Sequence, residues 1–333
     1  MRLVLVTDAW LPQINGVVRT LETLKDRLAA LGHDPLYITP DRFRSVPCPT
    51  YPEIRLALAG RRAVGEMIDR HQPEAVHIAT EGPLGWLARR HCLKAGHPFT
   101  TAYHTQFPQY IHARSRLPVA WSYAVLRRFH GRSSGIMVAT QSIEDELRAR
   151  GFAPPIRRWT RGVDTTLYHP RDKAFLPFPR PISLFVGRVA VEKNIAAFLK
   201  LDLPGTKVVV GEGPARAALA ARHPEVRFLG RKVGEDLARH YAAADVFVFP
   251  SRTDTFGLVL LEALASGVPV AAYPVPGPLD VIDHSGAGVL DEDLAAATRQ
   301  ALTIAPERCR AHAETYSWDR SVQQFLGNLH RFP

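Results

Sequence analysis

Cysteine is scarce in this sequence, and its histidines form no motif. Three cysteines occur among the 333 residues, Cys48, Cys92 and Cys309, and they lie far apart. The 14 histidines are scattered, with no HExxH motif and no closely spaced pair. Structural zinc sites and disulfide frameworks show cysteines or histidines at characteristic spacings. We therefore expect no disulfide and no bound metal.

Long apolar runs are also missing. No stretch approaches the roughly 18–20 apolar residues that are needed to cross a bilayer. The opening MRLVLVTDAW has one basic residue and a short apolar run that ends at Asp8, which is typical of a first β-strand and not of a signal peptide. No internal repeat or low-complexity tract occurs. The lack of a membrane-spanning run and the strand-like opening predict a cytoplasmic protein.

The first half of the chain has few acidic residues for its number of basic ones. Residues 1–165 contain 23 Lys and Arg against 14 Asp and Glu, a balance of +9. Residues 166–333 are nearly neutral, with 19 against 18. Basic charge confined to one half suggests that one face of one domain meets an anionic partner.

Short β-branched runs alternate with amphipathic helical patterns along the whole chain. Residues 2–8 predict a strand and residues 17–34 a helix that ends at Gly32, and in SIEDELRARGF Ser142 is expected to be the N-cap. Strands separated by helices indicate a parallel sheet that is covered on both faces. The other predicted strands are 35–40, 74–80, 98–105 and 135–140, then 181–189, 206–213, 226–231, 244–251, 267–275 and 286–290.

The strand pattern restarts after a proline-rich stretch without periodicity at 161–181. A chain of this length exceeds the size at which one hydrophobic core keeps growing. We therefore predict an α/β protein with two doubly wound domains, 1–163 and 164–316, and a helix at 317–333 that returns to the first domain. Such folds bind ligands at the carboxyl ends of their strands, which directs attention to the loops that follow strands.

Two of these loops have features that suit an anion. In WLPQINGVVRT (10–20), Gly16 stands where a helix begins, and backbone N–H groups at a helix N-terminus bind anions. The alternative is a tight turn in which the glycine has a positive φ. In FVGRVAVEKN (185–194), Arg188 and Lys193 could hold a diphosphate, or they could be solvated surface charges.

The stretch SRTDTFGLVLLEALASGVPV (251–270) places Asp254 in a loop and Glu262 in a helix that begins near Phe256. Because Glu is rarely buried without a partner, an acid in such apolar surroundings points to a ligand. Asp254 and the N–H groups that follow it could bind a neutral polyol. The alternative is a helix-capping Asp254 and a structural Glu262.

His104, in AYHTQFPQY (102–110), follows a strand of the first domain and is expected to face the same ligand cleft, although a structural histidine would occur there too. The acids of DED (291–293) resemble a metal-binding pair. They precede LAAATRQAL, so acids at a helix N-terminus explain them better.

Taken in order, these loops resemble those of glycosyltransferase family 4. The resemblance covers nearly the whole chain and is strongest over 181–276, with RGVDTTLYHP, GRKVGEDLARHYAAADVFVFPS and DTFGLVLLEALASGVPV as its main segments. The last segment matches the family's pair of acids separated by seven residues. The family usually has Glu at the first position, where this chain has Asp254, so the reach toward the sugar is one methylene shorter.

The resemblance implies the GT-B fold, in which two Rossmann-like domains face each other across a cleft, and a retaining hexosyltransferase that uses a UDP- or GDP-sugar. It implies that Gly16, Arg188 and Lys193 hold the diphosphate and that Glu262 accepts hydrogen bonds from the ribose. The predicted catalytic residues are His104, Asp254, Arg188 and Lys193. The other donor-binding residues are Lys232, Val233, Thr255, Phe256, Gly257 and Leu258, largely through their backbone.

The family's chemistry requires no metal and no further cofactor, because cations and helix N-termini stabilise the leaving nucleoside diphosphate. In the usual account of retention, the departing phosphate itself takes the acceptor's proton. We therefore expect a metal-independent enzyme and name no enzymic nucleophile.

The basic first domain is expected to bind the acceptor. Segment 112–134 interleaves basic and aromatic side chains, which suits an anionic membrane surface, although an ordinary helix with a buried aromatic side would look the same. We predict a lipid acceptor such as diacylglycerol, a peripheral position at the inner membrane face and no nucleic-acid partner. The alternatives are a soluble or polysaccharide acceptor, a nucleotide-sugar epimerase and a non-catalytic binding protein. The residues concerned are Arg114, Arg116, Trp121, Tyr123, Leu126, Arg127, Arg128, Phe129 and Arg132.

Overall fold

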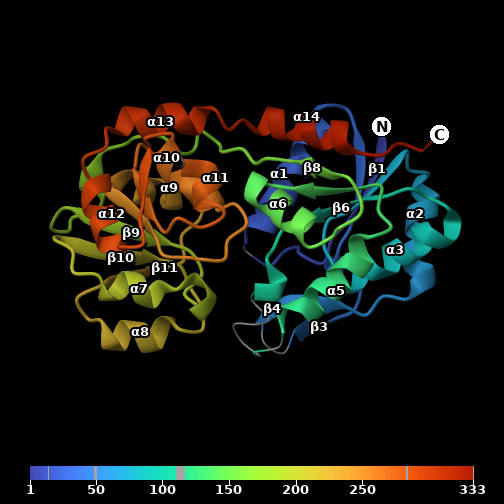
Figure 1. Ribbon diagram of the computed structural model, residues 1–333, viewed down its shortest axis with the longest axis horizontal. Helices are drawn as coiled ribbons and strands as arrows, with labels where there is room; N and C mark the ends of the chain where they lie inside the picture. Colours follow the sequence, from blue (N-terminus) through green and yellow to red (C-terminus); the bar gives the residue numbers. More distant parts are fainter. Residues whose placement is uncertain (14, 49–50, 110–115, 117, 283, 333) are drawn as a thin grey trace. The chain divides into compact units, whose positions relative to one another are not determined.

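The structure is a computed structural model that describes residues 1–13, 15–48, 51–109, 116, 118–282 and 284–332. The chain forms two compact units. The first unit is Met1–Thr160 with Asp319–Pro333, and the second is Arg161–Trp318. Each unit contains a six-stranded sheet with helices packed around it (Figure 1).

The sheet of the first unit is parallel throughout, in the order β2-β1-β5-β6-β7-β8. Its central strands are buried along their full length, as expected for a sheet covered on both faces. The strands are β1 (Arg2–Val6), β2 (Asp34–Ile38), β5 (Ala75–Ile78), β6 (Thr100–Tyr103), β7 (Gly135–Val138) and β8 (Ile156–Arg158).

The helices of the first unit follow the predicted alternation. They are α1 (Gly16–Ala30), α2 (Arg61–His71), α3 (Pro83–Ala95), α5 (Val119–His130) and α6 (Gln141–Ala149), with a short 3-10 helix η1 (Pro40–Arg42). The prediction of Ser142 as the N-cap of α6 is wrong. The cap is Thr140, whose Oγ1 accepts the Ile143 N–H, because the helix begins one residue before Ser142.

The antiparallel hairpin β3 (Ser45–Cys48) and β4 (Tyr51–Ala57) was not predicted from the sequence. The strands are short, each contains a proline, and β3 is mostly exposed. Because a proline within a run argues against a strand, the alternation of polar and apolar residues in β4 was not recognised as one.

The sheet of the second unit is also parallel, in the order β11-β10-β9-β12-β13-β14. Numbered from β9, this is the 3-2-1-4-5-6 order of a dinucleotide-binding Rossmann fold, in which ligands bind beyond the carboxyl ends of the strands where the order reverses. That point lies between β9 and β12. The strands are β9 (Ile182–Val186), β10 (Thr206–Val210), β11 (Arg227–Gly230), β12 (Val246–Phe249), β13 (Val270–Ala272) and β14 (Gly288–Leu290).

Helix α12 of the second unit tests the interpretation that the acids of DED (291–293) stand at a helix N-terminus. Asp293 caps α12 and accepts the N–H groups of Ala295 and Ala296, so the helix-terminus explanation is confirmed. The helical segments are η2 (Lys173–Phe175), η3 (Val191–Lys193), α7 (Ile195–Lys200), α8 (Arg216–Arg222), α9 (Gly234–Ala243), α10 (Leu258–Ala265), α11 (Pro278–Ile282), α12 (Leu294–Ala301) and α13 (Pro306–Glu314).

The last helix, α14 (Trp318–Asn328), packs within the first unit from Asp319 onward. Gln324 Oε1 accepts the Thr160 N–H at 2.9 Å, and the buried Phe325 ring lies 5.0 Å from the Trp159 ring. In the described residues, no helix has the length and hydrophobicity that a membrane span requires.

Candidate functional site

The loop after β9 lies at the point where the strand order of the second sheet reverses. Arg188 is partly exposed, and its guanidinium Nε lies 3.8 Å from the Glu192 carboxylate. Asn194, which has a left-handed backbone (φ 50°), donates from Nδ2 to the Pro250 carbonyl at 3.0 Å. This hydrogen bond ties the β9 loop to the end of β12, so the two loops form one site.

Lys193 and Asp254 meet across these two loops. The Lys193 Nζ lies 2.5 Å from Asp254 Oδ1, and both side chains are mostly buried, with exposed fractions of 22% and 16%. The second carboxylate oxygen, Asp254 Oδ2, is buried and has no hydrogen-bond partner among the described residues. A buried acceptor without a donor is costly, so this oxygen is suited to accept a hydrogen bond from a ligand.

The loop after β12 turns directly into α10. Gly257 caps this helix with φ 82°, which favours glycine, and the helix begins at Leu258, two residues after the predicted start near Phe256. The Phe256 ring is buried against Tyr316, so this residue can face a ligand only through its backbone. Thr255 to Leu258 therefore bring main-chain N–H groups to a helix N-terminus beside Asp254.

Glu262 lies inside α10 and is 3% exposed. Its Oε2 accepts a hydrogen bond from the Tyr241 hydroxyl of α9 at 2.8 Å. Tyr241 was not identified from the sequence, because a tyrosine on the buried face of an amphipathic helix carries no signal of this contact. It orients the carboxylate that we predict to bind ribose.

Lys232 and Val233 follow β11. The Lys232 ammonium lies 3.2 Å from the Asp236 carboxylate, one helical turn away. Val233 precedes the first residue of α9, and its side chain is exposed. Their predicted contacts with the nucleotide-sugar donor stay predictions.

Gly16 is the first residue of α1, which begins one residue before the predicted start at 17, and the alternative of a positive-φ turn at Gly16 is wrong. Asn15 caps the helix, and its Oδ1 accepts the N–H groups of Val17 and Val18 at 3.0 Å. Two of the helix's free N–H groups are thus already bonded within the protein, and a diphosphate contact at Gly16 stays a prediction.

His104 follows β6, whose carboxyl end lies at the same edge of the first sheet as that of β1. The imidazole is 9% exposed, and its ring lies edge-on to Trp159 at 5.4 Å. Burial against a tryptophan fixes the ring, which is compatible with either a structural or a catalytic role.

Asp8 is a buried acid that sequence reasoning did not single out as a site residue. Its carboxylate accepts the N–H groups of Leu84 and Gly85 at the start of α3, and the Thr80 hydroxyl. Asp8 and Thr80 follow β1 and β5, the strands between which the order of the first sheet reverses. Burial raises the pKa of the Asp8 carboxyl to about 6, although the two N–H groups and the Thr80 hydroxyl oppose the shift.

The raised pKa of Asp8 predicts a pH-dependent loss of stability. The fold favours the protonated acid, so this contribution is complete below the unfolded pKa and disappears as the pH rises through about 6. We expect the free energy of unfolding of the wild type, relative to Asp8→Asn, to fall by about 2 kcal/mol between pH 4 and 7. Urea denaturation of both proteins across this range measures the difference. A difference that stays constant or rises with pH would contradict the assignment.

The basic segment of the first unit has its aromatic side inside the protein. Tyr123, Leu126 and Phe129 of α5 are buried, whereas Trp121 is 68% exposed. Arg114 lies outside the described residues. The description of α5 as a helix with a buried aromatic side is therefore correct for Tyr123, Leu126 and Phe129, whereas Trp121 remains available for an external partner.

A groove of about 550 Å³ lies between α2, α3 and α5 and is rich in arginine. The pKa of Arg89 is lowered by burial and by the nearby cations Arg128 and Arg132. Cations that are packed this closely favour an anionic ligand. The described residues that line the groove are Ala57, Ala59, Arg61, Pro83, Trp86, Leu87, Arg89, Arg90, Leu93 and Arg128, and none is acidic.

Comparison with known protein families assigns both units. Residues 14–167 match Glycosyltransferase Family 4, and residues 180–305 match Glycosyl transferases group 1. A GDP-mannose-dependent alpha-mannosyltransferase of Mycobacterium tuberculosis is 30% identical over 319 residues, covering 87% of this chain and 83% of the relative. An alpha-monoglucosyldiacylglycerol synthase of Streptococcus pneumoniae is 29% identical over 380 residues, covering 100% of this chain and 85% of the relative.

Among solved structures, sucrose-phosphate synthase of Thermosynechococcus elongatus is similar with a TM-score of 0.77 and 22% identity. The match covers 98% of this chain and 97% of the other. This likeness and the two parallel sheets confirm the predicted GT-B fold with two Rossmann-like units.

Proposed function

Since the chain belongs to glycosyltransferase family 4 and is a nucleotide-sugar-dependent transferase, we propose that it is a retaining hexosyltransferase with GDP-mannose as its donor and a membrane lipid as its acceptor. The main observation that supports the position of the donor site is the Lys193–Asp254 ion pair. It lies where the strand order of the second sheet reverses. A cation and an anion at that point match the two parts of a nucleotide sugar, its diphosphate and its hexose hydroxyls.

In this proposal the bound donor replaces the Lys193–Asp254 ion pair: each of the two side chains contacts the donor instead of the other. The diphosphate takes Lys193 as a counter-charge, with Arg188 from the same loop. Asp254 then binds sugar hydroxyls, and its Oδ2, which has no partner among the described residues, accepts one of them. Glu262, held by Tyr241, accepts hydrogen bonds from the ribose.

The transfer breaks the bond between the anomeric carbon and the phosphate oxygen and forms a bond from the same carbon to the acceptor oxygen. The acceptor proton passes to the departing phosphate, so the reaction needs no enzymic nucleophile. Lys193, Arg188 and the N–H groups at the start of α10 stabilise the charge that develops on the leaving group. These groups supply the charge that a divalent metal provides in other transferases, and we propose that the donor site works without one.

The relatives guide the choice of donor and stereochemistry. The mycobacterial relative is described as GDP-mannose-dependent, and both curated relatives are described as forming alpha linkages. GDP-mannose carries an α-linked sugar, so an α-linked product corresponds to retention.

Two observations support a lipid acceptor: the name of the streptococcal relative and the arginine-rich groove of the first unit. The streptococcal relative is named for a glycosylated diacylglycerol. The arginine groove of the first unit combines cations with the apolar side chains of Trp86, Leu87 and Leu93, which suits an anionic bilayer surface.

The experiment supplies radiolabelled GDP-mannose or UDP-glucose to vesicles of phosphatidylglycerol with diacylglycerol and, in parallel, to water-soluble acceptors, all in the presence of EDTA. We expect the label to enter the organic-extractable fraction as an α-linked mannolipid. If UDP-glucose is the only donor accepted, the donor assignment is wrong. If only water-soluble acceptors are glycosylated, the lipid assignment is wrong.

The groove makes a separate prediction about membrane binding. Each basic residue near an anionic bilayer contributes about 1 kcal/mol, so Arg90→Gln with Arg128→Gln should weaken sedimentation with phosphatidylglycerol vesicles about tenfold or more. The matched control removes two exposed arginines elsewhere, Arg222 and Arg320. Equal weakening in both double variants would mean that net charge, not the groove, governs binding.

A further inference from the structure

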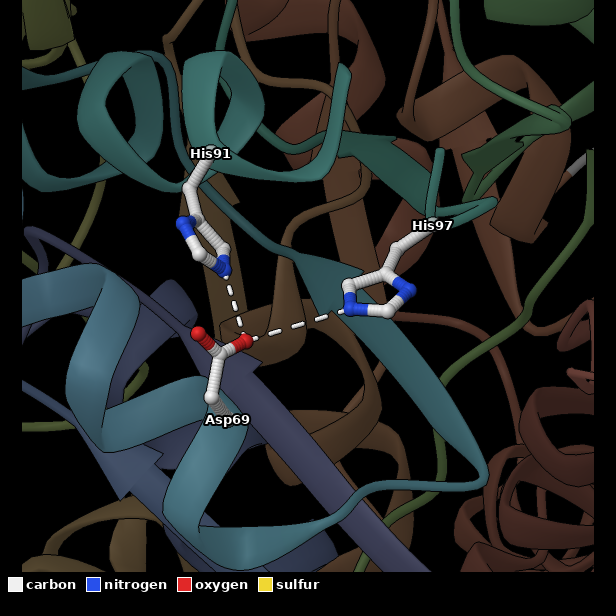
Figure 2. Close-up of side chains that lie close together, drawn as sticks. All are labelled: Asp69, His91 and His97. Atoms are coloured by element: carbon white, nitrogen blue, oxygen red, sulfur yellow. Dashed lines mark hydrogen bonds and ion pairs between the residues drawn. The ribbon is translucent and has the colours of Figure 1, made fainter. Parts of the chain in front are cut away.

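Three side chains that bind metals well meet on the surface of the first unit. Figure 2 shows the imidazoles of His91 and His97 both directed at the same oxygen of the Asp69 carboxylate. The His91 Nε2 lies 2.8 Å from Asp69 Oδ1, and the His97 Nε2 lies 3.9 Å from the same oxygen. All three ligand atoms lie within 4.8 Å of one another.

The fold holds these residues in place from several directions. Asp69 is on α2, His91 is on α3, and His97 follows the end of α3. The His97 N–H donates to the Cys92 carbonyl, and its ring stacks on Phe332 with centroids 4.9 Å apart and an interplanar angle of 13°. Both histidine side chains remain partly accessible, with exposed fractions of 20% and 33%.

Gly65 on α2 leaves the space that His91 occupies. A Cβ at this position would lie 2.5 Å from the His91 Nδ1, so a larger residue would push the imidazole away from Asp69. The two histidine positions and the carboxylate therefore depend on close packing between α2 and α3.

We propose that Asp69, His91 and His97 form a binding site for a zinc-class divalent cation. In a tetrahedral site with bonds of about 2.0–2.1 Å, ligand atoms are about 3.3 Å apart. The observed separations from Asp69 lie on both sides of this value, so small side-chain rotations bring all three atoms to one ion. Water fills the fourth position. Two imidazole nitrogens favour zinc-class metals over Mg²⁺ and Ca²⁺, which prefer oxygen ligands.

The site differs in place and role from the donor site. All three ligands belong to the first unit, whereas Lys193 and Asp254 belong to the second. A bound ion would join α2 to the end of α3 and, through the stacked His97 ring, to Phe332 near the end of the chain. It would therefore fasten the C-terminal segment rather than act on a sugar, and its test does not depend on turnover.

His97 distinguishes a metal site from an ordinary ion pair. The Asp69–His91 contact could by itself tie α2 to α3, but such a pair needs no third ligand. Removing His97 should leave that pair intact and remove one of three metal bonds. His97→Gln keeps a planar polar side chain, and its exposure makes the change compatible with folding.

The experiment titrates the full chain, without a polyhistidine tag, with Zn²⁺ in a calorimeter and with Co²⁺ in a spectrophotometer. We expect one Zn²⁺ per chain, with at least about tenfold weaker binding in His97→Gln and in Asp69→Asn. The control His223→Ala, which changes a histidine that pairs only with Glu225 among the acids of the described chain, should bind as the wild type does. Visible Co²⁺ bands of tetrahedral intensity should appear in the wild type and vanish in His97→Gln.

Two results would overturn the proposal. One is the absence of stoichiometric Zn²⁺ uptake by the wild type. The other is equal Zn²⁺ affinity in the wild type and His97→Gln when both have the same thermal stability, which would leave Asp69 and His91 as a simple pair.

Discussion

Replacing Lys193 with alanine is expected to lower kcat by about 100- to 1,000-fold, the effect of removing one electrostatic group from a leaving-group site. Lys193 is the cation that contacts Asp254, with its ammonium 2.5 Å from the carboxylate. Without it, the charge that develops on the departing diphosphate is opposed mainly by Arg188 and the start of α10. Steady-state kinetics with saturating donor measure the change.

The matched control is Lys200→Ala. Lys200 is an exposed lysine at the end of α7, close in sequence to Lys193 but outside the loop. It should turn over donor at the wild-type rate. If Lys193→Ala keeps more than about half of the wild-type kcat while remaining folded, Lys193 has no role in stabilising the leaving group.

Asp254→Asn is expected to lower kcat/KM by about 10- to 100-fold. A hydrogen bond to a charged acceptor contributes about 1.5–3 kcal/mol, and the amide offers only a neutral acceptor to the sugar hydroxyl. Asp254→Glu keeps the charge and restores the acid that the family usually has, so it should lose less activity than Asp254→Asn. If Asp254→Asn has wild-type kcat/KM, Asp254 does not bind the sugar.

A double-mutant cycle separates the two roles that Asp254 could have. If this residue only positions Lys193, Asp254→Asn should have no effect in a Lys193→Ala background. We expect a further loss of several-fold there, because the proposal gives Oδ2 its own contact with a sugar hydroxyl. The two residues touch, so their effects should not be additive, and the size of the coupling measures the ion pair.

The sequence predicted the α/β architecture because short, mostly apolar runs alternate with amphipathic helical patterns along the chain. It also directed attention to the loops after β9 and β12, since ligand loops in such sheets follow the strands. The contact between Lys193 and Asp254 could not be predicted in the same way. The two residues are separated by 61 positions, and only the order of the folded strands places their loops together.

The other features that the sequence did not predict also depend on contacts between separate elements of the fold. Tyr241 reaches Glu262 through the packing of α9 on α10, which no pattern within either helix encodes. Asp69, His91 and His97 come from two helices and a connection, so the absence of a spaced histidine motif did not exclude their meeting. The predicted cap at Ser142 was wrong because the helix begins at Gln141, and the hydroxyl of Thr140, one residue earlier, caps it.

The most direct test of the donor-site account is the change in thermal stability of the full chain with GDP-mannose, GDP, UDP-glucose and UDP, all in EDTA. A ligand at a hundred times its Kd stabilises the native state by about 2.7 kcal/mol. We predict a clear upward shift with GDP-mannose in the wild type and in Lys200→Ala, and a much smaller one in Lys193→Ala. No shift with any nucleotide, or the same shift in Lys193→Ala, would contradict the assignment of Lys193 and Asp254 to the donor site.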